Sequence, residues 1–310
     1  MQTTNGSYNA LPETLPLESN FLAIEEEYSN YKNSQIAIIS APFEQTVSYG
    51  GGAEYGPEAI LKASAYVEFY DEEFERELCN DRGIATLAPI DFGEARDLAA
   101  LEMIESQCKR ALDDGKFVVT LGGEHTISFA PIRAHYEKYP EMSVLHFDAH
   151  SDLRVEYEGS PYSHACVMSR VADFFPPERI TQIGIRAQCK EEAQFIRERK
   201  VNTFFAYAIR RGDYGADWVK KAVATLAKQV YITFDVDCFD PSIMPTTGTP
   251  EPNGLLYEEA LAIFREIVAS GREIIGFDVV ELAPVEGIHH TDLTTARLVY
   301  KLLNVTFSNK

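Results

Sequence analysis

Aspartate and histidine residues recur at two-residue spacing in this 310-residue chain. Asp148, His150 and Asp152 lie within the segment HFDAHSDLR, and Asp235 and Asp237 form a second set in TFDVDCFD. Residues two apart on an extended strand point to the same side. If the strand persists, the first three side chains are therefore expected to converge on one point that could hold a metal ion.

With His125 of the segment LGGEHT, the set contains four carboxylates and two imidazoles. Carboxylates packed this closely would repel one another and could not all stay ionised, whereas divalent cations would neutralise them. A ligand set rich in oxygen with some imidazole suits manganese better than zinc, although nickel or cobalt could use similar ligands. Six ligands are too many for one catalytic ion, so the sequence predicts two ions about 3.5–4 Å apart.

Each motif alone is weak evidence for a metal site. A single D-x-H-x-D motif could reflect polarity at the end of a strand, and D-x-D occurs in many unrelated loops. The metal interpretation is favoured because the motifs fall in register with predicted strand ends.

The elements that would position these residues are short apolar runs alternating with amphipathic stretches. Predicted strands cover residues 35–40, 117–121, 143–148, 180–184, 201–205, 230–235 and 273–278, and predicted helices include 98–112, 217–228 and 257–269. Strands that are apolar on both faces and separated by helices predict a parallel sheet covered on two sides, a three-layer α/β/α architecture. Residues 1–33 are expected to form an irregular N-terminal extension, and residues 34–310 a single catalytic domain.

In such sheets, ligands bind beyond the carboxyl ends of the strands. Polar segments follow four of the predicted strands directly, at residues 122–125, 148–152 and 235–237 and at Glu281. All four are therefore expected at the same edge of the sheet.

Composition excludes several classes of function. A net charge of -20 would repel nucleic acid at long range and attract a small cationic molecule. The five cysteines are scattered and form no C-x-x-C pair, which argues against a disulfide framework or a zinc knuckle. Without a signal-like start or an apolar stretch of membrane-spanning length, we expect a cytoplasmic protein that binds no membrane.

Five blocks resemble the ureohydrolase family, which includes arginase and agmatinase: GPEAI at 56–60, LGGEHT at 121–126, HFDAHSDLR at 146–154, TFDVDCFDPSIMPTTGTPEPNGL at 233–255 and GFDVVELAP at 276–284. The resemblance begins near residue 36, and the block at 233–255 is its most specific part. It implies an arginase-like fold with a central, mainly parallel sheet of about eight strands. It also implies metal-dependent hydrolysis of a guanidinium group to urea and an amine, and a homo-oligomer, either a trimer or a hexamer.

The resemblance also implies a role for each site residue. Asp148 and Asp235 would bridge two manganese ions, with His125 and Asp152 completing one site and His150 and Asp237 the other. Asp152 would also orient the attacking hydroxide.

Two further residues are implied to act on the substrate. Glu281 would hold the guanidinium by charge-assisted hydrogen bonds, and His164 would protonate the departing amine. Two positions depart from the family pattern. Glu124 replaces the more usual aspartate and is expected to support His125, and Ala165 follows His164 where glycine is common.

The segment 153–164 bears on the choice of substrate. It lacks the Asn- and Ser-containing pattern by which arginases bind an α-amino acid. Glu156 and Glu158 would attract the distal ammonium of agmatine or the tail of aminopropylagmatine, while Arg154 could instead pair with a substrate carboxylate. An agmatinase-type activity is therefore predicted. Arginase, guanidinobutyrase and guanidine hydrolase are the alternatives within this chemistry, and a metal-binding oligomeric pseudoenzyme is the alternative from another class.

The remaining histidines receive structural interpretations. His135 is expected on a helix and His146 inside a strand, and His289 and His290 at the pocket rim or in a subunit contact. Cys238 is expected to be a small packed side chain.

Overall fold

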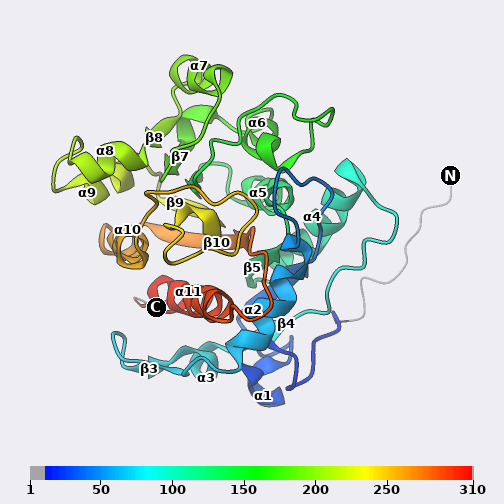
Figure 1. The fold of residues 1–310 in the computed structure, drawn as a ribbon. Helices are drawn as coiled ribbons and strands as arrows, with labels where there is room; N and C mark the ends of the chain where they lie inside the picture. Colours follow the sequence, from blue (N-terminus) through cyan, green and yellow to red (C-terminus); the bar gives the residue numbers. More distant parts are fainter. Residues whose placement is uncertain (1–10, 309–310) are drawn as a thin grey trace.

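A computed structural model describes residues 11–308, which form an eight-stranded sheet covered by helices on both faces (Figure 1). The strand order is β4-β1-β5-β10-β9-β6-β7-β8, and all neighbouring strands are parallel. The strands are β1 (Ile36–Ala41), β4 (Ile84–Thr86), β5 (Phe117–Gly122), β6 (Ser143–Phe147), β7 (Ile180–Ile183), β8 (Asn202–Phe204), β9 (Gln229–Asp235) and β10 (Glu273–Val280). This arrangement confirms the predicted three-layer α/β/α class.

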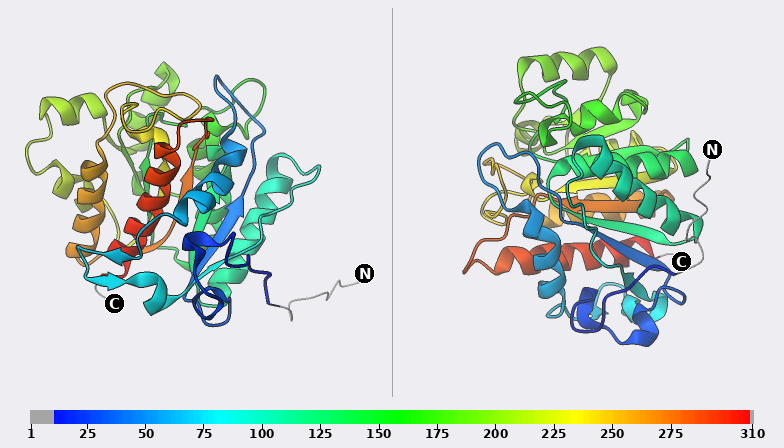
Figure 2. Two further views of the ribbon diagram at one scale, coloured as in Figure 1. Left: turned by 60° about the horizontal axis from the view of Figure 1, so that its bottom comes forward. Right: turned by 90° about the vertical axis from the view of Figure 1, so that its right-hand side faces the viewer.

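Two apolar clusters lie on opposite faces of the sheet. Alternate residues of β1 enter different clusters, Ile36 and Ile38 the first, Ala37 and Ile39 the second. The first cluster includes α2 (Gly56–Ser64), α9 (Trp218–Ala224), α10 (Tyr257–Ala269) and α11 (His290–Thr306), and the second includes α4 (Asp97–Asp113), α5 (Phe129–Lys138) and α6 (Val167–Val171). Figure 2 shows the red helix α11 and the teal helices α4 and α5 on opposite sides of the strands. Burial of both faces explains why the strands are apolar throughout.

The other elements are short. They are α1 (Glu26–Ser29), α3 (Leu78–Arg82), α7 (Lys190–Arg199), α8 (Ala206–Arg211), the antiparallel pair β2 (Tyr70–Asp71) and β3 (Arg76–Glu77), and the 3-10 turns η1 (Phe21–Ala23), η2 (Ala53–Tyr55), η3 (His125–Ser128), η4 (His164–Cys166), η5 (Pro177–Arg179) and η6 (Val236–Cys238). Within residues 11–308, every helix is too short or too polar to cross a bilayer.

Part of the N-terminal segment packs into the body of the protein. Phe21, Leu22 and Ile24 are at most 2% exposed and belong to the first apolar cluster. The backbone N–H of Phe21 donates to the Thr86 hydroxyl at 2.9 Å, which ties η1 to the edge strand β4. The predicted domain boundary at residue 34 stays a prediction, and residues 1–10 lie outside the described part of the chain.

The central four strands position the site. β5, β10, β9 and β6 are neighbours, although other elements separate most of them in the sequence. Parallel strands end at the same edge, so the chain leaves all four strands on one side. The four polar segments that follow these strands are therefore brought together.

Candidate metal centre

His125 begins the turn η3, and two glycines place it there. A Cβ on Gly123 would lie 2.1 Å from the carbonyl oxygen of Phe43, and one on Gly122 would lie 2.7 Å from the side chain of Val280. Neither position has room for a side chain, because a Cβ at Gly122 would also meet the side chain of Ile127. Gly123 lets the backbone before His125 lie against the chain that leaves β1.

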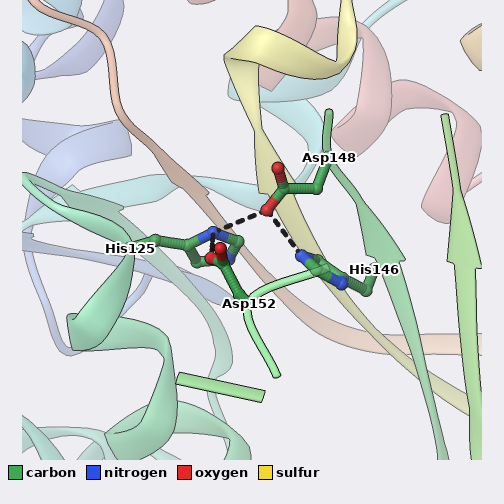
Figure 3. Close-up of side chains that lie close together, drawn as sticks. All are labelled: His125, His146, Asp148 and Asp152. Carbon is green, nitrogen blue, oxygen red and sulfur yellow. Dashed lines mark hydrogen bonds and ion pairs between the residues drawn. The ribbon is translucent and has the colours of Figure 1, made fainter. Parts of the chain in front are cut away.

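Three carboxylates surround one nitrogen of His125. Its Nδ1 atom lies 3.0 Å from one oxygen of Asp148 and 3.1 Å from one oxygen of Asp152 (Figure 3). It also lies 3.2 Å from one oxygen of Asp235. The ring is buried, and none of these oxygens is placed to form a hydrogen bond with Nδ1. The nitrogen is thus enclosed by acceptors.

The other nitrogen shows which tautomer is present. Nε2 of His125 lies 3.0 Å from the Thr233 hydroxyl, and that hydroxyl donates to Asp278 at 2.7 Å. Since the only hydroxyl hydrogen of Thr233 points to Asp278, Nε2 must be the donor to Thr233. As a metal ligand the ring is neutral, and Nδ1 then presents its lone pair to three carboxylate oxygens. Burial favours the neutral ring, but the three aspartates outweigh it and raise the pKa of His125 well above its usual range. The site therefore favours a cation at this nitrogen, and the residues fit a metal ion.

A second group of possible ligands adjoins the first. Nδ1 of His150 lies 2.9 Å from Asp237 and 3.5 Å from Asp148. Possible ligand atoms of His125, Asp148 and Asp152, together with His146, lie within 4.8 Å of one another, as do those of Asp148, His150 and Asp237. Asp148 belongs to both groups, so the chain offers two adjacent positions for a metal ion.

The expectation that Asp148, His150 and Asp152 converge on one point is wrong. Strand β6 ends at Phe147, and Asp152 adopts a left-handed backbone with φ 52°. Because the backbone turns after the strand, Asp152 joins His125 while His150 joins Asp237.

Backbone N–H groups hold one oxygen of each of three carboxylates. Asp148 accepts from the N–H of His150 at 2.5 Å, Asp235 from that of Asp237 at 2.8 Å, and Asp237 from that of Ala149 at 2.9 Å. The second oxygen of Asp148 lies beside His125 and His146, that of Asp235 beside His125, and that of Asp237 beside His150. These hydrogen bonds orient the second oxygens toward the cluster.

His146 is buried in β6 as expected, but it also orients a carboxylate. Its Nε2 atom lies 2.7 Å from Asp148, and its Nδ1 atom lies 3.0 Å from the side-chain nitrogen of Gln182. Because the amide donates to Nδ1, Nε2 carries the hydrogen that Asp148 accepts. The signal for this role was the position of His146 in β6, two residues before Asp148, which follows the strand.

The electrostatics of the cluster call for positive charge. Burial raises the pKa of Asp235 well above its usual range and that of Asp152 to about 7. Burial acts on Asp148 in the same direction, but the neighbouring histidines outweigh it and hold the pKa of Asp148 well below its usual range. Not all of these carboxylates can be ionised together without additional cations.

Glu281 follows β10 and faces the same space. Its φ is 65°, its N–H donates to Gly123 at 2.9 Å, and its Oε1 accepts from the N–H of His125 at 2.5 Å. A strained backbone of this kind is often found at functional sites. Oε2 makes no such backbone contact, and burial raises the pKa of the Glu281 carboxyl well above its usual range.

A cavity of about 250 Å³ lies over the cluster. Six carboxylate residues line it: Glu44, Asp152, Glu192, Asp235, Asp237 and Glu281. Among the described residues of the lining, Arg154 is the single lysine or arginine. Its Nε lies 4.0 Å from Glu192, and its guanidinium stacks on the Tyr157 ring at 4.9 Å. The cavity suits a small cation.

His164 lines the cavity and is held at both ring nitrogens. Nδ1 lies 2.8 Å from the Thr46 hydroxyl, and Nε2 lies 2.8 Å from the Ser48 hydroxyl. Burial, together with the charges of His150 and His125, lowers the pKa of His164 to about 4.

Several predicted residues lie elsewhere. Glu156 and Glu158 are exposed and do not line the cavity, because the Tyr157–Ser160 bridge turns this loop outward. Glu44 and Glu192 line it instead, and no sequence pattern marked them. His289 and His290 are exposed at the start of α11 and do not line the cavity.

The expectation that Glu124 supports His125 is wrong. Its Oε2 accepts from the Gln45 N–H, the Thr46 N–H and the Thr46 hydroxyl, so the carboxylate holds the loop after β1. The hydrogen bond of the His125 ring runs to Thr233 and not to Glu124.

Comparison with known proteins agrees with this geometry. The chain is 41% identical over 284 residues to the N(1)-aminopropylagmatine ureohydrolase of Synechocystis sp., covering 90% of this chain and 91% of that protein. It is 35% identical to the agmatinase of Bacillus anthracis, covering 87% and 90%. The structure of agmatine ureohydrolase from Thermoplasma volcanium superposes with a TM-score of 0.83 at 29% identity, covering 95% of this chain and 96% of that one. Since the model of the arginase family also matches residues 34–304, this chain belongs to the arginase family.

Proposed function

We propose that this chain, a hydrolase that releases urea and an amine from guanidino compounds, acts on agmatine or on N1-aminopropylagmatine. The names of its relatives support this choice, since both kinds of enzyme stand at 35–41% identity. The products would be putrescine from agmatine and spermidine from aminopropylagmatine.

We propose that two manganese ions occupy the cluster. Asp148 and Asp235 would bridge them, with His125 and Asp152 on one ion and His150 and Asp237 on the other. The observation that carries this proposal is that Nδ1 of His125 lies 3.0–3.2 Å from oxygens of three carboxylates, an arrangement that calls for a cation. Nickel and cobalt fit the same donors, and the metal content of the isolated protein distinguishes them.

The side chains divide the work of the reaction. Divalent ions held in the cluster would supply a nucleophile at neutral pH by lowering the pKa of water. Asp152 would orient that nucleophile by hydrogen bonding. Glu281, anchored through Oε1 to the backbone of His125, would present Oε2 to the N–H groups of the planar guanidinium.

His164 would carry a proton between the two reacting groups. The nucleophile adds to the guanidinium carbon, and the bond from that carbon to the alkyl-bearing nitrogen then breaks. The departing nitrogen needs a proton, and the attacking water releases one. Because the pKa of His164 is lowered to about 4, its imidazole is neutral at pH 7 and free to accept that proton and pass it on.

The charges of the cavity support a dicationic substrate. Six carboxylates line it, and the single cation Arg154 is already beside Glu192. A substrate carboxylate, as in arginine or guanidinobutyrate, would find no unoccupied partner and would meet net negative charge. We propose that Glu44, which lines the cavity, receives the distal ammonium in place of the exposed Glu156.

Urea release by the purified protein with manganese tests this proposal. Agmatine, aminopropylagmatine, arginine, guanidinobutyrate and guanidine are compared at equal concentration. Agmatine or aminopropylagmatine should give the highest kcat/KM, and urea from arginine alone would refute the substrate assignment. Asp235→Ala should abolish turnover while leaving the assembly intact. An unchanged rate would refute the metal assignment, whereas a wild-type protein that assembles but releases no urea from any of the five compounds would favour a metal-binding scaffold.

We also propose a cytoplasmic homo-oligomer. All five cysteines are free, which suits a reducing compartment. The family resemblance supports a trimer or hexamer, and sedimentation velocity of the purified protein measures this.

A further inference from the structure

We propose that Glu124, acting through Thr46, fixes the tautomer and orientation of His164, so that Nε2 is the nitrogen that gains and loses the catalytic proton. This inference rests on the proposed proton-transfer role of His164. It makes Glu124 and Thr46 positioning residues, since neither is required to touch the reacting atoms.

The first step concerns the Glu124 oxygen. Oε2 accepts three hydrogen bonds, from the Gln45 N–H at 2.9 Å, the Thr46 N–H at 2.5 Å and the Thr46 hydroxyl at 3.0 Å. An oxygen that already accepts two N–H groups has no hydrogen to offer the hydroxyl. This holds whether or not the other oxygen of the carboxyl carries a proton. Thr46 must therefore donate its only hydroxyl hydrogen to Glu124.

The second step concerns the acceptor capacity of Thr46. Its hydroxyl oxygen lies 3.1 Å from the backbone N–H of His164, which donates to it, and 2.8 Å from Nδ1 of the same residue. With its hydrogen directed to Glu124, the oxygen acts toward both groups as an acceptor. Nδ1 of His164 must therefore carry a hydrogen.

The third step places the reactive lone pair. In a neutral imidazole with the hydrogen on Nδ1, Nε2 is bare and accepts from the Ser48 hydroxyl at 2.8 Å. Proton gain and loss can then occur only at Nε2. The contact of Nε2 with Ser48 is exposed, whereas that of Nδ1 with Thr46 is partly buried, so Nε2 is the more accessible nitrogen of a ring that lines the cavity.

The loop that carries Thr46 is itself held firmly. The side chain of Gln45 donates to Asp97 at 2.6 Å and accepts from the Asp97 N–H at 2.9 Å. The Glu44 carboxylate accepts from the N–H groups of Gly52 and Ala53. Thr46 is thus positioned from α4, from the turn η2 and from the strand end that carries Glu124.

The test separates tautomer control from simple anchoring of the loop. Thr46→Val keeps the shape of the side chain and leaves Nδ1–H without an acceptor. In the manganese-loaded enzyme, kcat for agmatine or aminopropylagmatine, whichever is turned over faster, should fall by at least about tenfold, within the range that general acid–base catalysis contributes. KM and manganese content should stay near the wild-type values, and the limb of the pH profile of kcat that depends on His164 should move. Thr46→Ser restores the hydroxyl and should rescue both kcat and the pH profile.

Two further variants sharpen the result. Glu124→Ala should reproduce the kinetic pattern of Thr46→Val, and the double variant should lose little more than either single variant, because both act through one chain of hydrogen bonds. Thr126→Val is the matched control. Its hydroxyl donates to the Tyr162 carbonyl at 2.8 Å and so ties down the segment that carries His164, while the hydrogen bonds of the His164 ring run to Thr46 and Ser48. This control should leave the limb of the pH profile in place.

Two results would overturn the inference in distinguishable ways. A Thr46→Val enzyme with wild-type kcat and pH profile would refute it, provided that His164→Ala is inactive. If His164→Ala keeps a kcat near that of the wild type, the proton-transfer role fails first and the inference fails with it.

Discussion

Replacing Thr233 by valine should weaken metal binding although Thr233 touches no ion in the proposed site. The substitution keeps the size of the side chain and removes the hydroxyl that lies between His125 Nε2 and Asp278. Thr233 and Asp278 are fully buried, so water cannot take the place of the hydroxyl. Asp278 keeps hydrogen bonds from Ser128 at 2.9 Å and Tyr231 at 2.8 Å. In the variant, the group left without a hydrogen-bond partner is therefore Nε2 of His125.

The magnitude follows from the tautomer of His125. A metal on Nδ1 requires the hydrogen to stay on Nε2, where the variant leaves it unpaired. Without metal, the hydrogen can move to Nδ1 and donate to a carboxylate. The ion-bound state alone therefore carries the cost of an unsatisfied buried donor, about 1–3 kcal/mol. This cost corresponds to an affinity lower by about 5- to 150-fold.

Calorimetric titration of Mn²⁺ into the metal-stripped protein measures this loss. Thr233→Ser keeps the hydroxyl and serves as the control, with wild-type affinity expected. If Thr233→Val binds both ions as tightly as the wild type while remaining folded, the deduced tautomer of His125 is incorrect.

Three other predictions test different parts of the structure. Dialysis against a chelator should abolish urea release, and added Mn²⁺ should restore it. Activity that survives complete metal removal would contradict the proposed metal centre. His135 is fully buried, which lowers its pKa to about 4 from 6.5. Its contribution to stability is therefore present above pH 6.5 and is lost as the pH falls toward 4. Between pH 7 and pH 5 the free energy of unfolding of the wild type should fall by about 2 kcal/mol more than that of His135→Gln, as measured by urea denaturation in the presence of a chelator. A difference between the two proteins that stays constant with pH would exclude this assignment. Gly123→Ala places a Cβ 2.1 Å from the Phe43 carbonyl oxygen. This clash should lower the free energy of unfolding by about 1–3 kcal/mol and reduce the manganese content of the protein. Wild-type values of both quantities would count against the close approach of the two segments.

The sheet and the clustering of the site residues could be predicted because they depend on local patterns. Apolar runs mark the central strands, and parallel strands end at one edge, so the polar residues that follow β5, β6, β9 and β10 must meet. The edge strand β4, which has three residues, was not predicted. Phe21 and Leu22 were placed in an irregular extension because their burial comes from distant partners, Thr86 and Ser64 among them.

Residues contributed by loops were harder to predict for the same reason. Glu44 and Glu192 line the cavity from segments separated by almost 150 residues, and nothing in the sequence near either one indicates a common site. Glu124 was placed next to the correct motif but given the wrong partner. Its neighbour in the sequence is His125, whereas its hydrogen bonds run to Gln45 and Thr46. A short sequence distance predicted a contact that the turn after β5 does not make.

The two-residue spacing of the aspartate motifs has a different physical cause from the one that the sequence suggested. Asp148 accepts the N–H of His150, and Asp235 accepts the N–H of Asp237, each through Oδ1. In both motifs an aspartate therefore bonds to the backbone two residues later and turns the chain. A turn, unlike a strand, directs neighbouring side chains of one motif to different sides. Asp148 therefore lies between His125 and His150. Asp152 lies beside His125 on one side of Asp148, and Asp237 lies beside His150 on the other. The D-x-[HD] spacing thus indicates a turn at the end of a strand. Because of that turn, His125 and five residues from two short motifs surround two metal positions instead of one.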